Sequence, residues 1–168
     1  MHYLITLLLI VFLAGIVFHD LKYLSIPLYI LLPVIVIAGL RSFLLNDSGR
    51  LVEMAAVNML GTILVLLVSC IILFVLKGRV FNPLNSLIGA GDLLFLPVLC
   101  ISFSPVNYWV FFVVSLLLIV IFRLIYKAPG RYIPLAGIQS VILVIALILT
   151  EVASISLFDD QPILNLIL

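Results

Sequence analysis

Two aspartates, Asp20 and Asp92, stand where an apolar stretch meets a short polar one. Asp20 follows the apolar run 3–18, and Asp92 directly precedes the apolar run 93–103. An unpaired carboxylate is costly in hydrocarbon, so ionisable residues at membrane depth are candidates for function. Neither aspartate has a basic partner at helical spacing, because Lys22 is only two residues from Asp20. The alternative is that both sit in hydrated loops at the membrane surface.

The surroundings of the two aspartates favour a functional role. Asp92 ends the motif Gly89-Ala90-Gly91-Asp92, and Asp20 precedes Ile26-Pro27 by six residues. Glycines let the backbone approach another chain closely. An aspartate at a helix start accepts backbone N–H bonds, and the helix dipole favours its ionised form. Each motif is short, and a helix cap or a turn between helices would look the same.

Together the two carboxylates could form a catalytic pair. Two close carboxylates do not both ionise easily, so they share one proton and titrate as a pair. The ionised member can take a proton from water, which then attacks a peptide carbonyl. The protonated member can polarise that carbonyl or protonate the leaving amine. This chemistry needs no metal and no cofactor, and we expect neither.

The composition indicates a membrane protein. Hydrophobic residues make up 67% of the 168 residues and charged residues only 9%, against roughly 25% charged in an average soluble domain. A soluble fold of this size could not hide so much apolar surface. The formal net charge is +1, so no overall field suggests a nucleic-acid partner.

Apolar runs of spanning length predict the fold class, an all-α integral membrane protein with about six transmembrane helices. We place these helices at about 3–18, 27–45, 51–76, 92–103, 108–126 and 133–150. The first is interpreted as a retained helix, since no basic residue precedes it as in a signal peptide. The whole chain, 1–168, is predicted to be one membrane-embedded domain, and the tail 151–168 is left unplaced.

The distribution of basic residues predicts the orientation. With the N-terminus outside, six of the eight Lys and Arg side chains fall in cytoplasmic loops and two in outer loops. The reverse orientation inverts that ratio, so the positive-inside rule favours an outside N-terminus and an outside acidic tail. Both aspartates then lie on the cytoplasmic side. This prediction depends on six spans, because one missed span would separate the two carboxylates.

Other candidates for chemistry are weaker. His19 adjoins Asp20 and could modulate it, but an interfacial polar residue is the simpler interpretation. The chain has no Gly-x-Ser-x-Gly elbow and no His-Glu-x-x-His zinc motif. Cys70 and Cys100 lie in apolar runs and do not form a Cys-x-x-Cys pair, so we interpret both as buried hydrophobic residues.

In these motifs the chain resembles the type IV prepilin peptidases, which are GxGD-type intramembrane aspartyl proteases. In that family one catalytic aspartate precedes an Ile-Pro, and the second ends Gly-x-Gly-Asp. The matching positions here are Asp20 with Ile26-Pro27, and Asp92 with Gly89 and Gly91. A late Ile-Pro segment, Ile133-Pro134-Leu135-Ala136-Gly137, is also similar. The resemblance covers about 14–147 and implies a GxGD-type helical bundle with Asp20 and Asp92 as catalytic residues.

The resemblance also implies a substrate and a place in the cell. It predicts an inner-membrane endopeptidase that cleaves the basic leader of prepilin or pseudopilin-like proteins at the cytoplasmic membrane boundary, in type IV pilus assembly or protein secretion. Larger members carry an extra zinc-binding region and also methylate the new N-terminus. Nothing in this chain matches that region, so we expect the short peptidase-only form.

Two departures from the family keep a second hypothesis open. Leu94 stands where the family usually has lysine, and Leu28 where it often has asparagine. An inactive relative that binds or assembles pilin-like proteins as a non-catalytic membrane subunit would tolerate such changes. An ion- or proton-coupled transporter is a third hypothesis. It ranks last, because transporter sites are usually found near the bilayer midplane on broken helices and these aspartates are at helix ends.

Overall fold

A computed structural model of the protein describes residues 2–23, 25–77, 90–126, 135–153, 156–161 and 164–165. Six helices lie within these ranges, and none of these residues forms a strand. The helices are α1 (His2–Tyr23), α2 (Leu28–Leu45), α3 (Ser48–Lys77), α5 (Ala90–Ser102), α6 (Pro105–Tyr126) and α7 (Leu135–Ala153). The all-α prediction is therefore confirmed for the described part of the chain.

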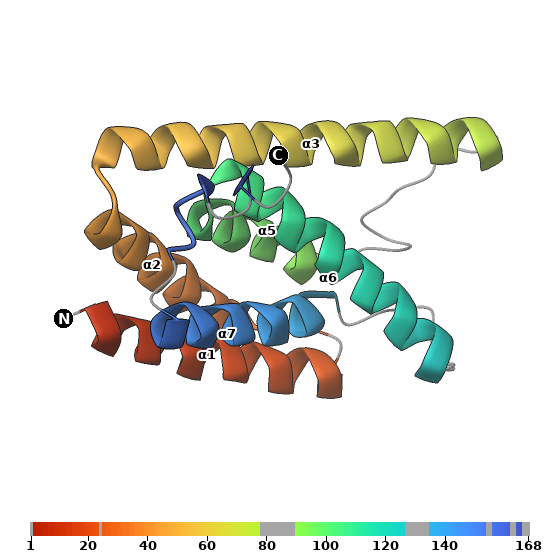
Figure 1. Cartoon of the computed structure of the whole chain (residues 1–168). Coiled ribbons are helices and arrows are strands. Elements are labelled where there is room, and N and C mark those ends of the chain that lie inside the picture. Colours follow the sequence, from red (N-terminus) through yellow and green to blue (C-terminus); the bar gives the residue numbers. More distant parts are fainter. Residues whose placement is uncertain are drawn as a thin grey trace.

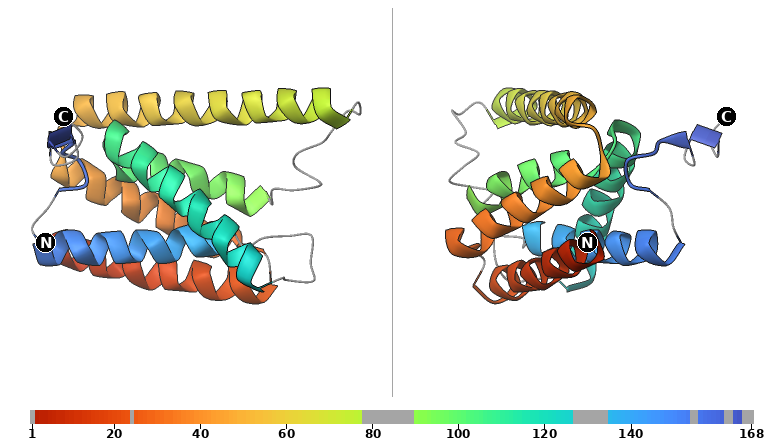
Figure 2. Two further views of the ribbon diagram at one scale, coloured as in Figure 1. Left: turned by 45° about the vertical axis from the view of Figure 1, so that its right-hand side comes forward. Right: turned by 90° about the vertical axis from the view of Figure 1, so that its left-hand side faces the viewer.

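Successive helices run in alternating directions, with α3 on one side of the bundle, α1 and α7 on the other, and α2, α5 and α6 between them (Figures 1 and 2). The helix α1 packs mainly against α7 and α2, and α5 lies between α2 and α3. The long helix α3 covers one side and α6 crosses the bundle obliquely, as Figure 2 shows. Because the directions alternate, the end of α1 and the starts of α5 and α7 meet at the same end of the bundle.

Five helices contain a segment long and apolar enough to cross a membrane. These segments are His2–Tyr23, Leu28–Leu45, Ser48–Ile72, Pro105–Phe122 and Leu135–Ala153. The remaining helix, α5, has 13 residues. It is about 20 Å long at 1.5 Å per residue, which is shorter than a hydrocarbon core of about 30 Å. In the described part of the chain, five helices rather than six have spanning length, and their length and composition are compatible with a multi-pass membrane protein.

The outer surface of the bundle is apolar. Large side chains such as Ile71, Val75, Leu124 and Val152 are exposed on it. In water this surface would be far larger than the apolar patches of soluble monomers. In a bilayer it is matched by lipid, while the helices satisfy their own backbone hydrogen bonds.

The helix ends confirm some sequence predictions and correct others. Pro27 is the N-cap of α2, with an extended backbone, as the sequence indicates. The predicted end of the first helix at Asp20 is wrong, because α1 continues to Tyr23 and Asp20 lies in its last turn. The predicted start of the fifth helix at Tyr108 is also too late. That helix, α6, begins at Pro105, where a proline's missing N–H is no loss.

The tail, which the sequence left unplaced, docks on the turn between α5 and α6. The Leu157 carbonyl accepts hydrogen bonds from the Ser104 amide at 3.0 Å and from Asn107 Nδ2 at 2.9 Å. Asp160 Oδ1 accepts from the Ser104 hydroxyl and, at 3.2 Å, from the Asn107 amide. Asp160 therefore caps the N-terminus of α6, where amides have no partner within the helix.

Candidate active site

Asp20 is a buried residue in the last turn of α1, with 4% of its surface exposed. Its Oδ2 accepts a hydrogen bond of 2.6 Å from the backbone amide of Gly137. Because the partner lies on another helix, the carboxylate does not compete for the backbone of α1.

Asp92 lies in the first turn of α5 and is 8% exposed. Its Oδ1 accepts a hydrogen bond of 2.9 Å from the backbone amide of Ala136. The sequence places Asp92 at a helix start, which the structure confirms. The sequence does not indicate that the carboxylate bonds to the start of a different helix, α7.

The two amides that hold the aspartates belong to adjacent residues. Ala136 and Gly137 are in the first turn of α7, where backbone N–H groups have no acceptor within the helix. The helix dipole also places positive potential there. The N-terminus of α7 thus brings Asp20 and Asp92 together, near enough for their charges to interact.

Two glycines allow this close approach. A Cβ on Gly137 would lie 3.0 Å from Asp20 Oδ2 and 3.2 Å from Asp20 Cβ. A Cβ on Gly91 would lie 3.1 Å from Cβ of Ile26. All three distances are shorter than ordinary packing contacts, so a side chain at either position would require Asp20 or Ile26 to shift by a few tenths of an ångström.

The structure therefore gathers most of the residues that the sequence singled out. Asp20, Asp92, Gly91 and Ile26 meet at one end of the bundle, and Pro27 follows Ile26 as the cap of α2. Gly89 lies outside the described residues, as do Ile133 and Pro134 of the late motif. The residues that sequence reasoning missed are Ala136 and Gly137 as hydrogen-bond donors. The only local feature of the sequence that points to these two donors is their position directly after the Ile133-Pro134-Leu135 segment.

The polar side chains next to Asp20 on α1, His19 and Lys22, pack against aromatic rings. Lys22 Nζ lies 5.2 Å from the ring centre of Phe18 and 5.0 Å from that of Tyr23. The ring of His19 lies 5.4 Å from Tyr23 and 6.3 Å from Tyr29, measured between centroids. Such contacts are typical of side chains at a membrane interface.

In the described ranges, no three His, Cys, Asp or Glu side chains gather in a way that could hold a metal ion. The donors around the two aspartates are backbone amides, which bind carboxylates and not cations. The arrangement itself is suited to acid and base catalysis by a carboxyl pair.

An apolar groove of about 440 Å³ lies between α6 and α7 and reaches Gly137, the residue that binds Asp20. It is lined by Leu21 of α1, by Leu118, Ile121, Phe122 and Ile125 of α6, and by Gly137, Ile138, Val141, Ile142 and Ile145 of α7. Gly137 belongs both to this groove and to the contact with Asp20. The groove is therefore adjacent to the Asp20 end of the carboxyl pair, although neither aspartate lines it.

Comparisons of the chain with protein-family models, curated proteins and solved structures find no match.

Proposed function

We propose that the protein is an aspartic endopeptidase of the GxGD type that cleaves the leader of prepilin- or pseudopilin-like proteins. The observation that carries this proposal is the pair of hydrogen bonds from adjacent amides, Ala136 to Asp92 and Gly137 to Asp20. These bonds hold two carboxylates from separate helices at one end of an apolar bundle. A pair of buried carboxyl groups is the minimum machinery for hydrolysis without a metal.

The chemistry follows from the pair. One carboxylate accepts a proton from a water molecule as the water oxygen attacks the peptide carbonyl. The other carboxyl group donates a proton to the carbonyl oxygen, and the departing amine takes up a proton when the C–N bond breaks. The amides of Ala136 and Gly137 orient the carboxylates by occupying one oxygen of each. Because both aspartates are buried, this end of the bundle would have to open around a substrate.

The groove supports a substrate that is partly apolar. A prepilin presents a basic leader followed by a hydrophobic helix, and cleavage takes place at their boundary. Its helix would lie along the groove between α6 and α7, which leads to Gly137 and Asp20. The predicted orientation puts the leader and both aspartates on the cytoplasmic side.

The departures from the family do not touch the carboxyl pair. Leu94 is 47% exposed, whereas Asp92, two residues before it on α5, is buried. Leu28, at the start of α2, is also exposed. Leu94 is two residues from Asp92 and therefore lies on another face of α5, and both leucines are exposed rather than packed at the buried carboxyl pair.

The second candidate function is a non-catalytic membrane subunit that binds or assembles pilin-like proteins. Leu94 is the residue that favours it, since the resembling family has lysine there. Such a subunit would bind a prepilin and leave its leader in place.

Co-expression with candidate prepilins separates the two functions. The enzyme yields a shortened pilin with a new N-terminus, which sequencing of the product identifies. Asp20→Asn and Asp92→Asn should each abolish this product, and Asp47→Asn, an exposed aspartate in the α2–α3 turn, should not. Retained processing in both active-pair variants would rule out the proposed mechanism. Association without shortening would favour the subunit.

A further inference from the structure

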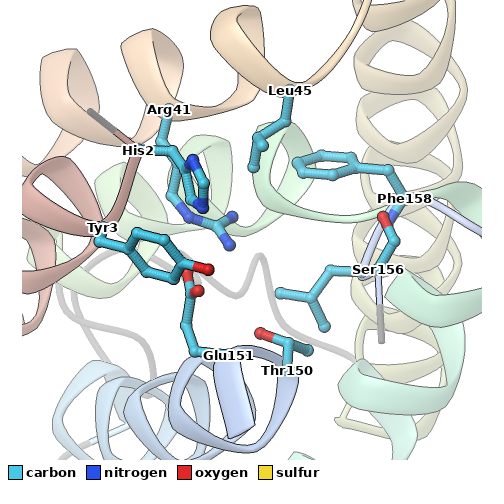
Figure 3. A pocket seen from close by; sticks show the side chains of 9 residues that line it. His2, Tyr3, Arg41, Leu45, Thr150, Glu151, Ser156 and Phe158 are labelled. Atoms are coloured by element: carbon cyan, nitrogen blue, oxygen red, sulfur yellow. The ribbon is translucent and has the colours of Figure 1, made fainter. Parts of the chain in front are cut away.

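A second polar site lies at the opposite end of the bundle from the aspartates. It is a pocket of about 240 Å³ between the start of α1, the end of α2, the end of α7 and the tail (Figure 3). Its lining residues are His2, Tyr3, Arg41, Leu45, Thr150, Glu151, Ser156, Leu157 and Phe158. Neither the proposed hydrolysis nor the groove beside Asp20 uses any of them.

The pocket is built around a buried arginine. Arg41 lies within the spanning segment of α2 and is 5% exposed. Its Nε donates a hydrogen bond of 3.1 Å to the hydroxyl of Thr6. The single proton of that hydroxyl has two acceptors in reach, Glu151 Oε1 at 3.0 Å and the His2 carbonyl at 3.1 Å. Thr6 thus joins the cation to the carboxylate, and the charges of Arg41 and Glu151 interact.

Most of the hydrogen-bonding capacity of Arg41 faces the pocket. A guanidinium group has five N–H donors, and within the described part of the chain Nε alone makes a hydrogen bond. The terminal nitrogens point into the space beside Glu151, as Figure 3 shows. The terminal nitrogens are not among the buried polar atoms that lack a partner, so they are accessible from the pocket and can donate to an acceptor bound there.

The depth of the pocket matches that of lipid headgroups. His2 and Asp20 lie at opposite ends of α1, about 27 Å apart at 1.5 Å per residue. This separation is close to the thickness of the hydrocarbon core, about 30 Å. If one end of α1 is at the membrane surface, the pocket at the other end is at the opposite surface.

The pocket carries both charges, and this selects the ligand. A simple anion would be attracted by Arg41 but repelled by Glu151. A simple cation would be attracted by Glu151 but repelled by Arg41. A group with a phosphate and an ammonium satisfies both, since guanidinium binds phosphate oxygens in a bidentate manner. The apolar side chains of Leu45 and Phe158 lie on the other side of the pocket from the charged pair (Figure 3), and Leu157 also lines it.

We propose that the pocket between Arg41 and Glu151 binds a phosphoethanolamine group, with the phosphate on Arg41 and the primary ammonium on Glu151. A phosphatidylethanolamine headgroup or free phosphoethanolamine would present this chemistry. The site shares no residue with the carboxyl pair, so its test does not depend on whether the protein is a peptidase.

Binding of defined lipids to the purified full chain tests the proposal. Native mass spectrometry would compare phosphatidylethanolamine, phosphatidylglycerol and phosphatidylcholine with the same acyl chains. The wild type should prefer phosphatidylethanolamine by about tenfold, because phosphatidylglycerol lacks the ammonium and phosphatidylcholine lacks its N–H donors. Soluble O-phosphoethanolamine at millimolar concentration identifies the source. Displacement of the lipid by it means that the group alone suffices, and lack of displacement means that the site needs the lipid's acyl chains.

Three variants locate the site. Glu151→Gln should remove the preference for phosphatidylethanolamine over phosphatidylglycerol, and Arg41→Gln should weaken all phospholipid binding about tenfold. Arg50→Gln removes the same charge from an exposed position in the first turn of α3 and should leave lipid binding unchanged. Arg41→Lys, which keeps the buried charge, serves if Arg41→Gln does not fold, and should weaken binding in the same direction. No headgroup preference in the wild type, a preference for phosphatidylglycerol, or a preference unchanged by Glu151→Gln would each overturn the proposal.

Discussion

Gly137 donates a 2.6 Å hydrogen bond from its backbone amide to the carboxylate of Asp20, across a sequence separation of 117 residues. The neighbouring amide, that of Ala136, bonds to Asp92 in the same way at 2.9 Å. The first turn of α7 is therefore the element that joins α1 to α5. The position of both carboxyl groups depends on how closely α7 approaches α1.

Gly137→Ala should strongly lower the rate of cleavage while leaving the protein folded. The added Cβ would lie 3.0 Å from Asp20 Oδ2, so the carboxylate must shift. A small displacement of a reacting group lowers the reaction rate strongly. We therefore expect kcat/KM to fall by about tenfold or more. The free energy of unfolding should drop by about 1–3 kcal/mol from overpacking. Processing assays and thermal denaturation of the variant measure the two effects.

Gly39→Ala is the matched control for that substitution. A Cβ at Gly39, inside α2, meets its nearest neighbour, Ile101 Cδ1, at 3.9 Å, which is ordinary contact. Alanine there should keep activity and raise stability by up to about 1 kcal/mol, because it has the higher helix propensity. Equal losses in both glycine variants would show that the Gly137–Asp20 contact has no special role.

Labelling of single cysteines should place the carboxyl pair on the cytoplasmic side. Ser25 is exposed between α1 and α2 at the aspartate end, and Gly49 is exposed at the other end, near the start of α3. In a chain with Cys70 and Cys100 replaced, we expect an impermeant maleimide to label Ser25→Cys only from the cytoplasmic face. Gly49→Cys should react from the outer face. The opposite pattern would contradict the orientation from basic residues, and labelling of both from one face would contradict the topology.

Asp160→Asn should loosen the tail and the start of α6. The carboxylate caps α6 through the Ser104 hydroxyl and the Asn107 amide. Loss of its charge at a helix N-terminus costs about 1 kcal/mol in unfolding free energy. Hydrogen exchange at the Asn107 amide should speed up, and Asp159→Asn, in which the neighbouring carboxylate does not reach α6, provides the comparison. Unchanged exchange in Asp160→Asn would show that the tail does not hold this helix.

Val141→Trp should hinder long substrates and spare short ones. Val141 lines the groove between α6 and α7, and an indole there would fill part of its volume. We expect KM for a full prepilin to rise about tenfold, while kcat/KM for a soluble leader peptide stays near that of the wild type. Leu149→Trp adds the same bulk on α7 at an exposed position outside the groove and should leave both values unchanged. If the two variants behave alike, the groove is not the path of the substrate helix.

Local features of the sequence were sufficient to predict most helix positions. Apolar run lengths and Pro27 mark the ends of spanning segments, and the glycines before Asp92 mark the start of α5. Where a helix end depends on a distant partner, prediction was wrong. The apolar run places the end of the first helix at about residue 18, whereas α1 continues to Tyr23, and Asp20 lies inside it with its carboxylate bound by Gly137 of α7.

The same reasoning limits what could be predicted of the sites. Gly91 and Ile26 were singled out as parts of motifs, but their contact depends on how α5 packs against the start of α2. Thr6, Arg41 and Glu151 come from three helices and share no motif, so no local pattern could link them. The placement of Asp20 with Asp92 is a feature of the structure, and their catalytic role stays a prediction.

The most direct measurement is cleavage of a purified prepilin by the purified protein in liposomes, with the product mass and new N-terminus determined. The account predicts cleavage at the leader boundary, at a rate unaffected by a metal chelator. It predicts that Asp20→Asn and Asp92→Asn each fold normally and lower that rate by about a hundredfold or more. Cleavage that persists in both variants, or that the chelator abolishes, would contradict it.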